Sequence, residues 1–349
     1  NVLTGANGMG KTNILDAVYY LCLGKSYFSA GDKFVVRHGS EFFRLEGTFR
    51  ESGNPEKVVI KSLPGNRKEI EVNGKKLERI GDLVGRYGCV IISPDDIHLM
   101  LEGSEERRNF INNTIVQTDT LYLDNLLLYT QLLKRRNSLL KTFADGHTFD
   151  PLLLDTVSES MAAPSVLIHN KRQELVRMLS PVFNQCYGAI SGSAEQVGIT
   201  YQSQLESRDL ITLFADTLAK DRLLARTTAG IHRDDLVFTM DGEPLKAFAS
   251  QGQLKSFVLS LKLAQYSIMQ SVSGRDPILL LDDIFDKLDH SRVQHLLALL
   301  HGGGYGQVFI TDTEASRMKT IMDQVVGDYH MFEVSKGNVS EKSSDPQPE

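Results

Sequence analysis

Eight residues near the start of the chain have the composition of a phosphate-binding loop. Residues 5–12 read GANGMGKT and satisfy the pattern G-x-x-x-x-G-K-[ST], after a strand-like stretch at residues 1–4 and before a helix-like run. Closely spaced glycines let successive backbone N–H groups face an anion, and the helix that follows adds partial positive charge at its N-terminus. The alternative is a glycine-rich turn that binds nothing.

The loop predicts a site for a nucleoside triphosphate, so the expected cofactors are ATP and Mg²⁺. Lys11 would reach the β- and γ-phosphates, and we count it among the catalytic candidates. The hydroxyl of Thr12 would bind Mg²⁺. The cofactor-binding candidates in the loop are Gly5, Ala6, Asn7, Gly8, Met9, Gly10, Lys11 and Thr12.

A second set of candidates follows the apolar stretch PILLL at residues 277–281. A continuous apolar run of this kind is typical of a central parallel strand that is covered on both faces. Asp282 and Asp283 then lie at the end of the strand where α/β sheets bind ligands. Asp282 is the candidate Mg²⁺ ligand, directly or through water, and Asp283 is the catalytic candidate that polarises the attacking water. The alternative is a helix N-cap in a solvated turn.

A third candidate segment is a turn that precedes apolar residues at helical spacing. Ser250 and Gln251 would lie at or beside a helix N-cap, and Gly252 would allow close approach of a phosphate. An ordinary capped core helix is the alternative. The order along the chain resembles that of ABC-type ATPases, with a Walker A loop, a long insertion, a signature turn before a helix, and a Walker B strand. In that arrangement the signature residues, Ser250, Gln251, Gly252 and Gln253, bind the nucleotide of a partner copy.

A D-loop candidate containing Asp286 and Asp289 follows the Walker B strand directly. Together the segments resemble the RecF family of SMC-like recombination-mediator ATPases, over residues 1 to about 315. The motifs that carry the resemblance are GANGMGKTNILDAVYYL at 5–21, VIISPDD at 90–96, EERRNFIN at 105–112, TTAGIHRDDL at 227–236, FASQGQLKSF at 248–257 and ILLLDDIFDKLD at 278–289.

The resemblance implies an α/β fold: an ABC-type P-loop ATPase head, with a mixed sheet and helices on both faces, plus an inserted helical lobe. We expect the head at residues 1–103 and 225–336 and the mainly helical lobe at 104–224. The tail at 337–349 has no apolar face, so we expect it to be disordered.

Two further features concern the order of elements. RecF-like proteins carry a pair of strands before Walker A, so we expect the start of the fold to lie outside this numbering. Within the insertion, Pro151, Pro164 and Pro181 are expected to divide the helical stretches.

The stoichiometry of the motifs predicts how the chain works. In ABC-type heads, the Walker A loop of one subunit and the signature turn of another close on the same ATP, and this chain has one copy of each. It should therefore form a head-to-tail homodimer around two ATP molecules. The resemblance implies that this dimer clamps duplex DNA near single-strand gaps and that hydrolysis releases it. The implied partners are RecO and RecR, which assist RecA loading.

Hydrolysis is expected to be slow and to be raised by DNA. Transport-type ABC ATPases have Glu after the Walker B Asp, whereas this chain has Asp283. They also have a switch His after the next strand, and here that strand is followed by Asp312 and Thr313. The alternatives are an ATPase subunit of another repair or transport complex, and a small-molecule P-loop kinase, which would lack the signature turn and D-loop.

Any DNA contact must come from local patches, because the net charge of the chain is −6. One basic patch lies in a predicted antiparallel hairpin, with strands at residues 57–63 and 68–72 and an Asn-Gly turn signal after them. Another lies on an amphipathic helix. Charged faces are often merely solvated. The DNA-contact candidates are Lys68, Lys75, Lys76, Lys134, Arg135 and Arg136.

Composition limits the size of the core, the chemistry of the cysteines and the location of the protein. A chain of 349 residues that is 41% hydrophobic can bury a large core. The three cysteines, Cys22, Cys89 and Cys186, lack metal-ligand spacing and are typical of reduced thiols. Neither a membrane-spanning stretch nor a signal peptide is visible, so we expect a cytoplasmic protein without a membrane partner.

Overall fold

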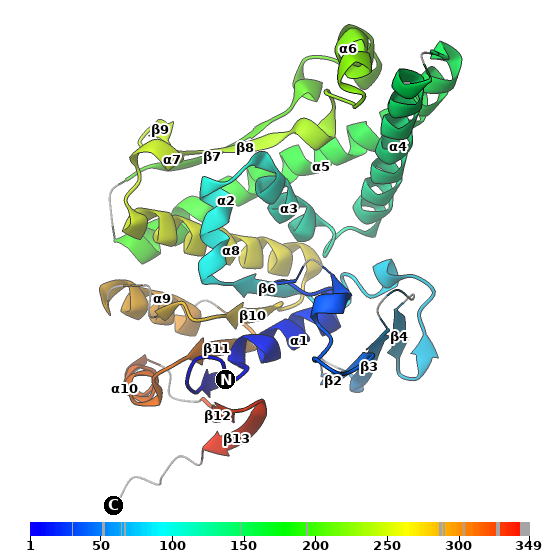
Figure 1. Cartoon of the computed structure of the whole chain (residues 1–349). Coiled ribbons are helices and arrows are strands. Elements are labelled where there is room, and N and C mark those ends of the chain that lie inside the picture. The colour runs from blue at the N-terminus through cyan, green and yellow to red at the C-terminus, as the bar shows by residue number, and fades with distance from the viewer. Residues whose placement is uncertain are drawn as a thin grey trace, which may run out of the picture. The chain divides into compact units, whose positions relative to one another are not determined.

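The computed structural model forms two compact units (Figure 1). The first unit comprises residues 1–97, 185–193 and 251–349, and the second comprises residues 98–184 and 194–250. The residues that the structure describes are 1–29, 31–50, 53–63, 65, 68–146, 148–192, 195–285, 288, 290–302, 304–325 and 329–342.

The first unit contains a six-stranded mixed sheet in the order β13-β12-β1-β11-β10-β6. All neighbouring strands in it are parallel except β12 and β13, which pair antiparallel. Strand β10 lies between β11 and β6, as the apolar run before Asp282 predicts. The strands are β1 (Val2–Thr4), β6 (Cys89–Ile92), β10 (Ile278–Leu281), β11 (Val308–Asp312), β12 (Met331–Ser335) and β13 (Asn338–Lys342).

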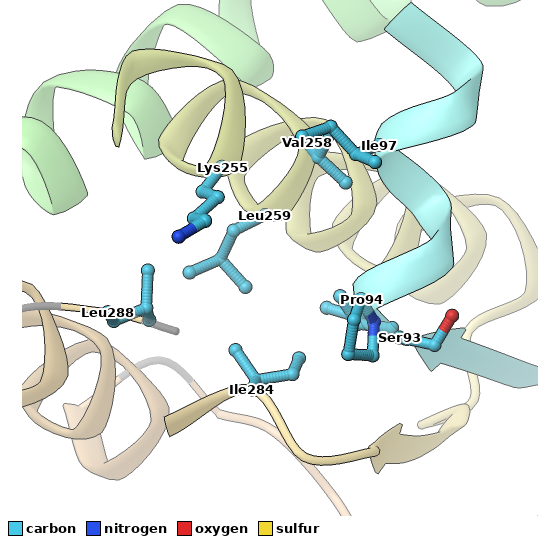
Figure 2. Close-up of a pocket in the computed structure, with 9 residues that line it drawn as sticks. Ser93, Pro94, Ile97, Lys255, Val258, Leu259, Ile284 and Leu288 are labelled. Carbon is cyan, nitrogen blue, oxygen red and sulfur yellow. The ribbon is translucent and has the colours of Figure 1, made fainter. Parts of the chain in front are cut away.

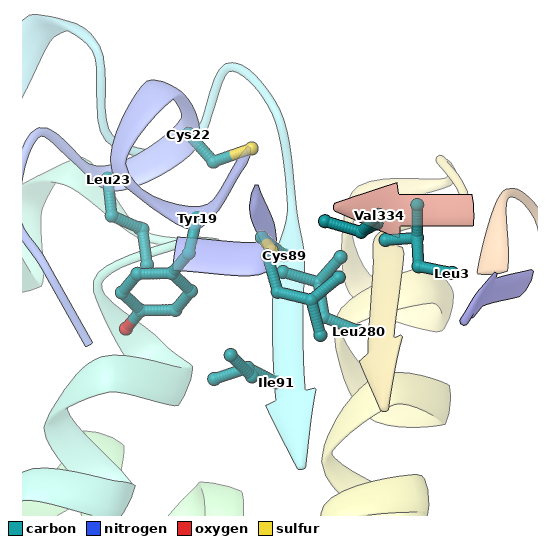
Figure 3. Close-up of a cluster of buried hydrophobic side chains, with 9 residues drawn as sticks. Leu3, Tyr19, Cys22, Leu23, Cys89, Ile91, Leu280 and Val334 are labelled. Atoms are coloured by element: carbon teal, nitrogen blue, oxygen red, sulfur yellow. The ribbon is translucent and has the colours of Figure 1, made fainter. Parts of the chain in front are cut away.

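Helices cover this sheet, and α1 packs on it through one apolar face. Leu15, Tyr19 and Cys22 recur at helical spacing and are buried in a cluster with Cys89 of β6 and Leu280 of β10 (Figure 3). Helix α8 packs against β6. The helices longer than one turn that begin in this unit are α1 (Lys11–Leu23), α8 (Gln251–Ser273), α9 (His290–Gly302) and α10 (Ala315–Val325).

A second, antiparallel sheet in the first unit has the order β2-β3-β4-β5. Asn73 and Gly74 connect β4 to β5 with φ values of 51° and 76°, the backbone of a type I′ hairpin turn. The predicted strands do pair antiparallel, as β3 with β4, but the Asn-Gly turn joins β4 to the short strand β5 and not β3 to β4. The strands of this sheet are β2 (Phe43–Phe49), β3 (Glu56–Ser62), β4 (Glu69–Val72) and β5 (Lys75–Lys76). The first unit also contains the short 3₁₀ helices η1 (Asp32–Phe34), η2 (Ile80–Asp82) and η3 (Pro94–Ile97).

The second unit combines helices with a three-stranded antiparallel sheet in the order β7-β8-β9. Its elements are α2 (His98–Leu101), α3 (Ser104–Ile115), α4 (Thr120–Asp145), α5 (Pro151–Ser191, which ends in the first unit), β7 (Val197–Gln202), η4 (Gln204–Glu206), α6 (Leu210–Leu224), η5 (Ile231–Arg233), β8 (Asp235–Met240), β9 (Glu243–Pro244) and α7 (Leu245–Phe248).

The prediction that prolines divide the insertion is wrong for two of the three. Pro151 begins α5, but Pro164 and Pro181 lie inside this 41-residue helix. The apolar face continues across both prolines, and its burial offsets the backbone hydrogen bonds that they remove. The buried residues that continue this face include Leu154, Val157, Met161, Ile168, Leu175, Leu179 and Phe183.

The predicted domain boundaries also need correction. Residues 225–250 belong with the second unit rather than with the head, because β8 pairs along its whole length with β7. Residues 337–342 are not a disordered tail, since β13 pairs with β12 through a turn in which Lys336 and Gly337 have φ values of 51° and 80°. Backbone pairing orders this strand without an apolar face.

One DNA-contact candidate, Arg136, is wrong because the side chain is buried in the second unit. The guanidinium is 1% exposed and donates to Asp221 at 2.7 Å, to Thr227 at 2.8 Å and to Ser158 at 3.1 Å. Tyr122, Tyr129, Arg136 and Leu140 form the buried face of α4, whereas Lys134 and Arg135 point to solvent.

Removing Asp221 should therefore cost more stability than removing a surface charge. Asp221→Ala leaves the buried Arg136 without its counterion, and we expect a loss of about 3–5 kcal/mol in the free energy of unfolding. Urea denaturation measures this change. The matched control is Lys134→Ala on the same helix, which should change stability by less than about 0.5 kcal/mol. Equal effects of the two changes would contradict the assignment.

Candidate nucleotide-binding site

The loop at residues 5–12 connects β1 to α1 and depends on its glycines. Gly5 has a φ of 154°, and a Cβ at this position would lie 2.3 Å from the carbonyl oxygen of Val334, so no other residue fits. Gly10, with a φ of 102°, is the N-cap of α1. Because a glycine brings no capping side chain, the N–H groups of the first helical turn are available to an anion.

Lys11 lies at the first position of α1 and folds back over the loop. Its Nζ donates hydrogen bonds to the carbonyl oxygens of Gly5 at 2.6 Å and Ala6 at 3.1 Å, and the residue is only 7% exposed. The ammonium group is thereby fixed beside the loop that would hold phosphate. This is the position that the sequence motif predicts.

Asp282 joins the two predicted halves of the site. Its carboxylate accepts hydrogen bonds from the hydroxyl of Thr12 at 3.0 and 3.1 Å, and from the hydroxyl of Thr311 at 2.7 Å. Thr12 begins α1 and Asp282 follows β10, so residues 270 positions apart meet at the carboxyl ends of the parallel strands. Thr311, which sequence reasoning did not single out, completes the contact from β11.

The oxygen ligands of this pair fit Mg²⁺. Mg²⁺ prefers oxygen atoms and is usually held by one or two carboxylates together with phosphates and waters. The hydroxyl of Thr12 and the carboxylate of Asp282 supply this donor set. Among the described residues there is no group of three or more His, Cys, Asp or Glu side chains that could hold a metal by themselves.

Asp283 has a backbone conformation that is unusual for a residue with a side chain. Its φ is 49°, and its N–H donates to the hydroxyl of Thr311 at 2.9 Å. Positive φ is uncommon outside glycine, although Asp adopts it more readily than most residues, and unusual backbone conformations of this kind are concentrated at functional sites. Thr311 therefore contacts both carboxylate residues of the Walker B segment. The D-loop candidates, Asp286 and Asp289, lie outside the described residues.

The signature turn is placed by α8. Ser250 directly precedes this helix, and Gln251, Gly252 and Gln253 form its first turn. A Cβ on Gly252 would lie 2.7 Å from Nη1 of Arg292, so the guanidinium packs directly on the glycine backbone. Sequence reasoning missed Arg292, because nothing in the local pattern of α9 indicates that it reaches a turn 40 residues earlier.

A small apolar hollow of about 50 Å³ lies beside the Walker B segment in the first unit (Figure 2). Ile284, which follows Asp283, forms part of its wall, and Lys255 extends from the first half of α8 beside it. The other lining residues are Ile92, Ser93, Pro94, Ile97, Val258, Leu259 and Leu288.

The basic hairpin retains only part of its predicted DNA-contact set. Lys68 is wrong as a candidate, because its Nζ donates to the carbonyl of Gly24 at 2.7 Å and pairs with Asp32 at 3.0 Å, leaving the side chain 14% exposed. Lys75 is exposed. Lys76 is exposed and pairs with Glu69 at 2.7 Å.

Similarity to known proteins agrees with this geometry. Residues 1–336 match the family model for the RecF/RecN/SMC N terminal domain. The chain is 42% identical over 332 residues to the DNA replication and repair protein RecF of Flavobacterium johnsoniae, covering 95% of this chain and 92% of that protein. The chain belongs to the RecF family. A RecF of Porphyromonas gingivalis is 41% identical over 341 residues, covering 97% and 93% of the two chains.

Solved structures give the same result for the fold. The structure of the recombination mediator protein RecF with ATP, from the RecFOR pathway, has a TM-score of 0.88 at 28% identity and covers 98% of this chain and 91% of that one. An Smc head bound to the C-winged helix domain of ScpA has a TM-score of 0.57 at 14% identity, a likeness of fold alone. The predicted ABC-type ATPase head is confirmed. In the part of the chain that the structure describes, no helix is suited by length and hydropathy to cross a bilayer.

Replacing Lys11 tests whether the loop binds phosphate. Lys11→Ala should fold, since the side chain contacts the loop itself rather than the core, yet it should lower ATP affinity by about 10- to 100-fold and abolish turnover. Isothermal titration with ATP measures the affinity. The control is Lys319→Ala, which removes an exposed lysine of α10 and should bind ATP within a few-fold of the unmodified protein. Unchanged ATP binding by Lys11→Ala would show that the loop is not used.

Proposed function

We propose that this chain is an ATP-dependent DNA-binding protein of recombinational repair, in which two copies close head to tail around two ATP molecules. The observation that supports this most directly is the hydrogen-bonded contact between Thr12 and Asp282. It brings the Walker A and Walker B segments into one site in each copy. The RecF structure with ATP supports the choice of nucleotide.

In the proposed reaction, the chain's own groups hold the nucleotide and orient water. The loop at residues 5–12 and Lys11 bind the phosphates, and Thr12 and Asp282 hold Mg²⁺, which neutralises phosphate charge when bound. Asp283 polarises the attacking water. The half-buried Asp283 follows Asp282 directly, and its backbone N–H donates to the hydroxyl of Thr311, so its backbone is held at the end of β10.

The dimer follows from the number of motifs in the chain. Each copy has one Walker A loop and one signature turn, made of Ser250, Gln251, Gly252 and Gln253. If the turn of each copy contacts the nucleotide of the other, two ATP molecules complete the assembly. Analytical ultracentrifugation with ATP, with ADP and without nucleotide tests this, and we expect a dimer only with ATP.

The DNA role rests on the family and on exposed cations. In the proposed cycle, the ATP-bound dimer clamps duplex DNA near single-strand gaps, and slow hydrolysis, raised by DNA, releases it. RecR and RecO are the proposed partners, and the step that they assist is RecA loading. Lys75 and Lys76 on the hairpin and Lys134 and Arg135 on α4 are the remaining candidates for phosphate contacts.

Asp283 should act on hydrolysis rather than on binding. Asp283→Asn keeps the size of the side chain and tolerates the left-handed backbone, but it weakens the polarisation of water. We expect ATP affinity to persist, turnover to fall by about 10²-fold or more, and the ATP dimer to accumulate. Phosphate release and sedimentation measure these effects. As a control, Asp95→Asn changes an exposed carboxylate in η3 and should leave turnover unaffected; wild-type turnover in Asp283→Asn would exclude the proposed role.

Ser250 should act only on dimer formation. Ser250→Arg places a bulky side chain where the turn must approach the γ-phosphate of the partner, so steric exclusion should block closure. ATP binding by the monomer should persist, while ATP-dependent dimerisation and the DNA affinity that depends on it are lost. Sedimentation and titration with labelled duplex measure both. Normal dimerisation of this variant with ATP would rule out the head-to-tail arrangement.

The hairpin supplies the contrasting variant. Reversing Lys75 and Lys76 to Glu should leave ATP-dependent dimerisation intact, because both side chains are exposed on the second sheet. Duplex binding should weaken and its dependence on salt should flatten, since fewer counterions are released from phosphates. The two sets of variants therefore separate closure of the dimer from contact with DNA.

A further inference from the structure

A buried ion pair connects η3 to the middle of α8 in the first unit. Nζ of Lys262 lies 2.7 Å from Oδ1 of Asp96, and the two side chains are 8% and 6% exposed. Lys262 also donates to the carbonyl oxygen of Ile91 at 3.1 Å, and the backbone N–H of Ser93 donates to Asp96 at 2.7 Å. All these groups lie outside the predicted nucleotide site.

Tyr27 extends this contact to α1. Its hydroxyl donates to Oδ1 of Asp96 and accepts from Nζ of Lys262 at 3.0 Å. The backbone N–H of Tyr27 in turn donates to Asp16 of α1 at 2.7 Å. Asp16 lies four residues after Thr12, on the same side of the helix. Tyr27 therefore links α1 to α8, because its backbone N–H contacts Asp16 and its hydroxyl contacts both Asp96 and Lys262.

Helix α8 is the element that carries the signature turn. Lys262 lies 11 residues after Gln251, the first residue of the helix, which corresponds to about 16 Å along its axis. Between the two, Val258 and Leu259 line the apolar hollow next to Pro94 and Ile97. The ion pair therefore adds a buried polar contact between α8 and η3 beside this apolar hollow.

Stability alone is a weak reason for such a pair. Two charges lose hydration when they are buried, and well-packed apolar residues of similar volume are often equally stable. A buried pair does, however, fix one geometry, because any other arrangement leaves a charge without its counterion. The Asp96 and Lys262 pair is therefore suited to setting the orientation of α8.

We propose that Asp96 and Lys262 are positioning residues that couple the nucleotide held by α1 to the signature turn at the start of α8. The inference rests on the proposed function. Nucleotide bound at Lys11 and Thr12 fixes α1, and Asp16 and Tyr27 pass this constraint to the ion pair. A copy that holds ATP thereby presents its turn in the geometry that fits the ATP of its partner.

The test separates binding within one copy from closure between copies. Lys262→Met and the double variant Asp96→Asn/Lys262→Met are compared by ATP titration under monomeric conditions, by sedimentation with ATP and by thermal melting. The double variant removes both charges, so neither is left buried alone. Tyr27→Phe removes a single hydroxyl and serves as the mildest change.

We expect each variant to bind ATP as a monomer within about twofold of the unmodified protein, while its ATP-dependent dimer affinity falls at least fivefold, the lower end of typical couplings between sites. In Tyr27→Phe the loss should be smaller than in the double variant. If the double variant melts at the unmodified temperature and dimerises normally with ATP, the coupling role is excluded. If the double variant does not fold, Tyr27→Phe decides: normal dimer affinity excludes the role, and reduced affinity supports it.

A buried pair in the second unit provides the matched control. Arg136→Met/Asp221→Asn removes an ion pair with the same nitrogen-to-oxygen distance as the Asp96–Lys262 pair, 2.7 Å, and with side chains that are also buried. It should alter the melting temperature without selectively weakening the ATP dimer. An equal loss of dimer affinity in this control would show that the effect is general destabilisation, which overturns the proposal. Failure of the unmodified protein to dimerise with ATP would instead reject the proposed function.

Discussion

The carboxylate of Asp282 is the contact on which the nucleotide-binding site depends. Asp282 is 5% exposed, and its carboxylate accepts hydrogen bonds from the hydroxyls of Thr12 and Thr311. The backbone N–H of Asp282 donates to the carbonyl oxygen of Ile92 at 2.8 Å. A buried charge without partners would be costly, so these donors hold it in place. The start of α1 and the ends of β6, β10 and β11 therefore meet around one residue.

The contacts of Asp282 depend on the geometry of an open α/β sheet. In a parallel sheet the carboxyl ends of neighbouring strands lie at the same edge, and loops that follow them converge. At this edge Thr311 makes two hydrogen bonds: its hydroxyl donates to the carboxylate of Asp282 and accepts from the N–H of Asp283. One threonine thus positions both the metal-ligand candidate and the catalytic candidate.

In the second unit, charged side chains connect several elements of the fold. In the segment TTAGIHRDDL, Asp234 accepts from Arg172 at 2.7 Å and from the hydroxyl of Tyr201 at 2.5 Å. Asp235 pairs with Arg107 at 2.7 Å. This segment contributed to the family resemblance, and these contacts give it a structural role: it connects α3, α5, β7 and β8 through hydrogen-bonded charges.

The sequence by itself determined the features that depend on neighbouring residues. The loop at residues 5–12, the strand before Asp282, the Asn73-Gly74 turn and the family all follow from local patterns, because steric limits and strand or helix periodicity act over a few residues. The same patterns located Lys11, Thr12, Asp282 and Asp283, which the fold brings together.

Tertiary structure decided what depends on distant partners. Arg136 belongs to a basic run, yet it lies on the buried face of α4 because its guanidinium donates hydrogen bonds to Asp221 and Thr227. Pro164 remains inside a helix because an apolar face continues past it. Residues 225–250 belong to the second unit and not to the predicted head, because β8 pairs with β7. In each case a partner far along the chain outweighs the local preference, and the local sequence does not record where that partner lies.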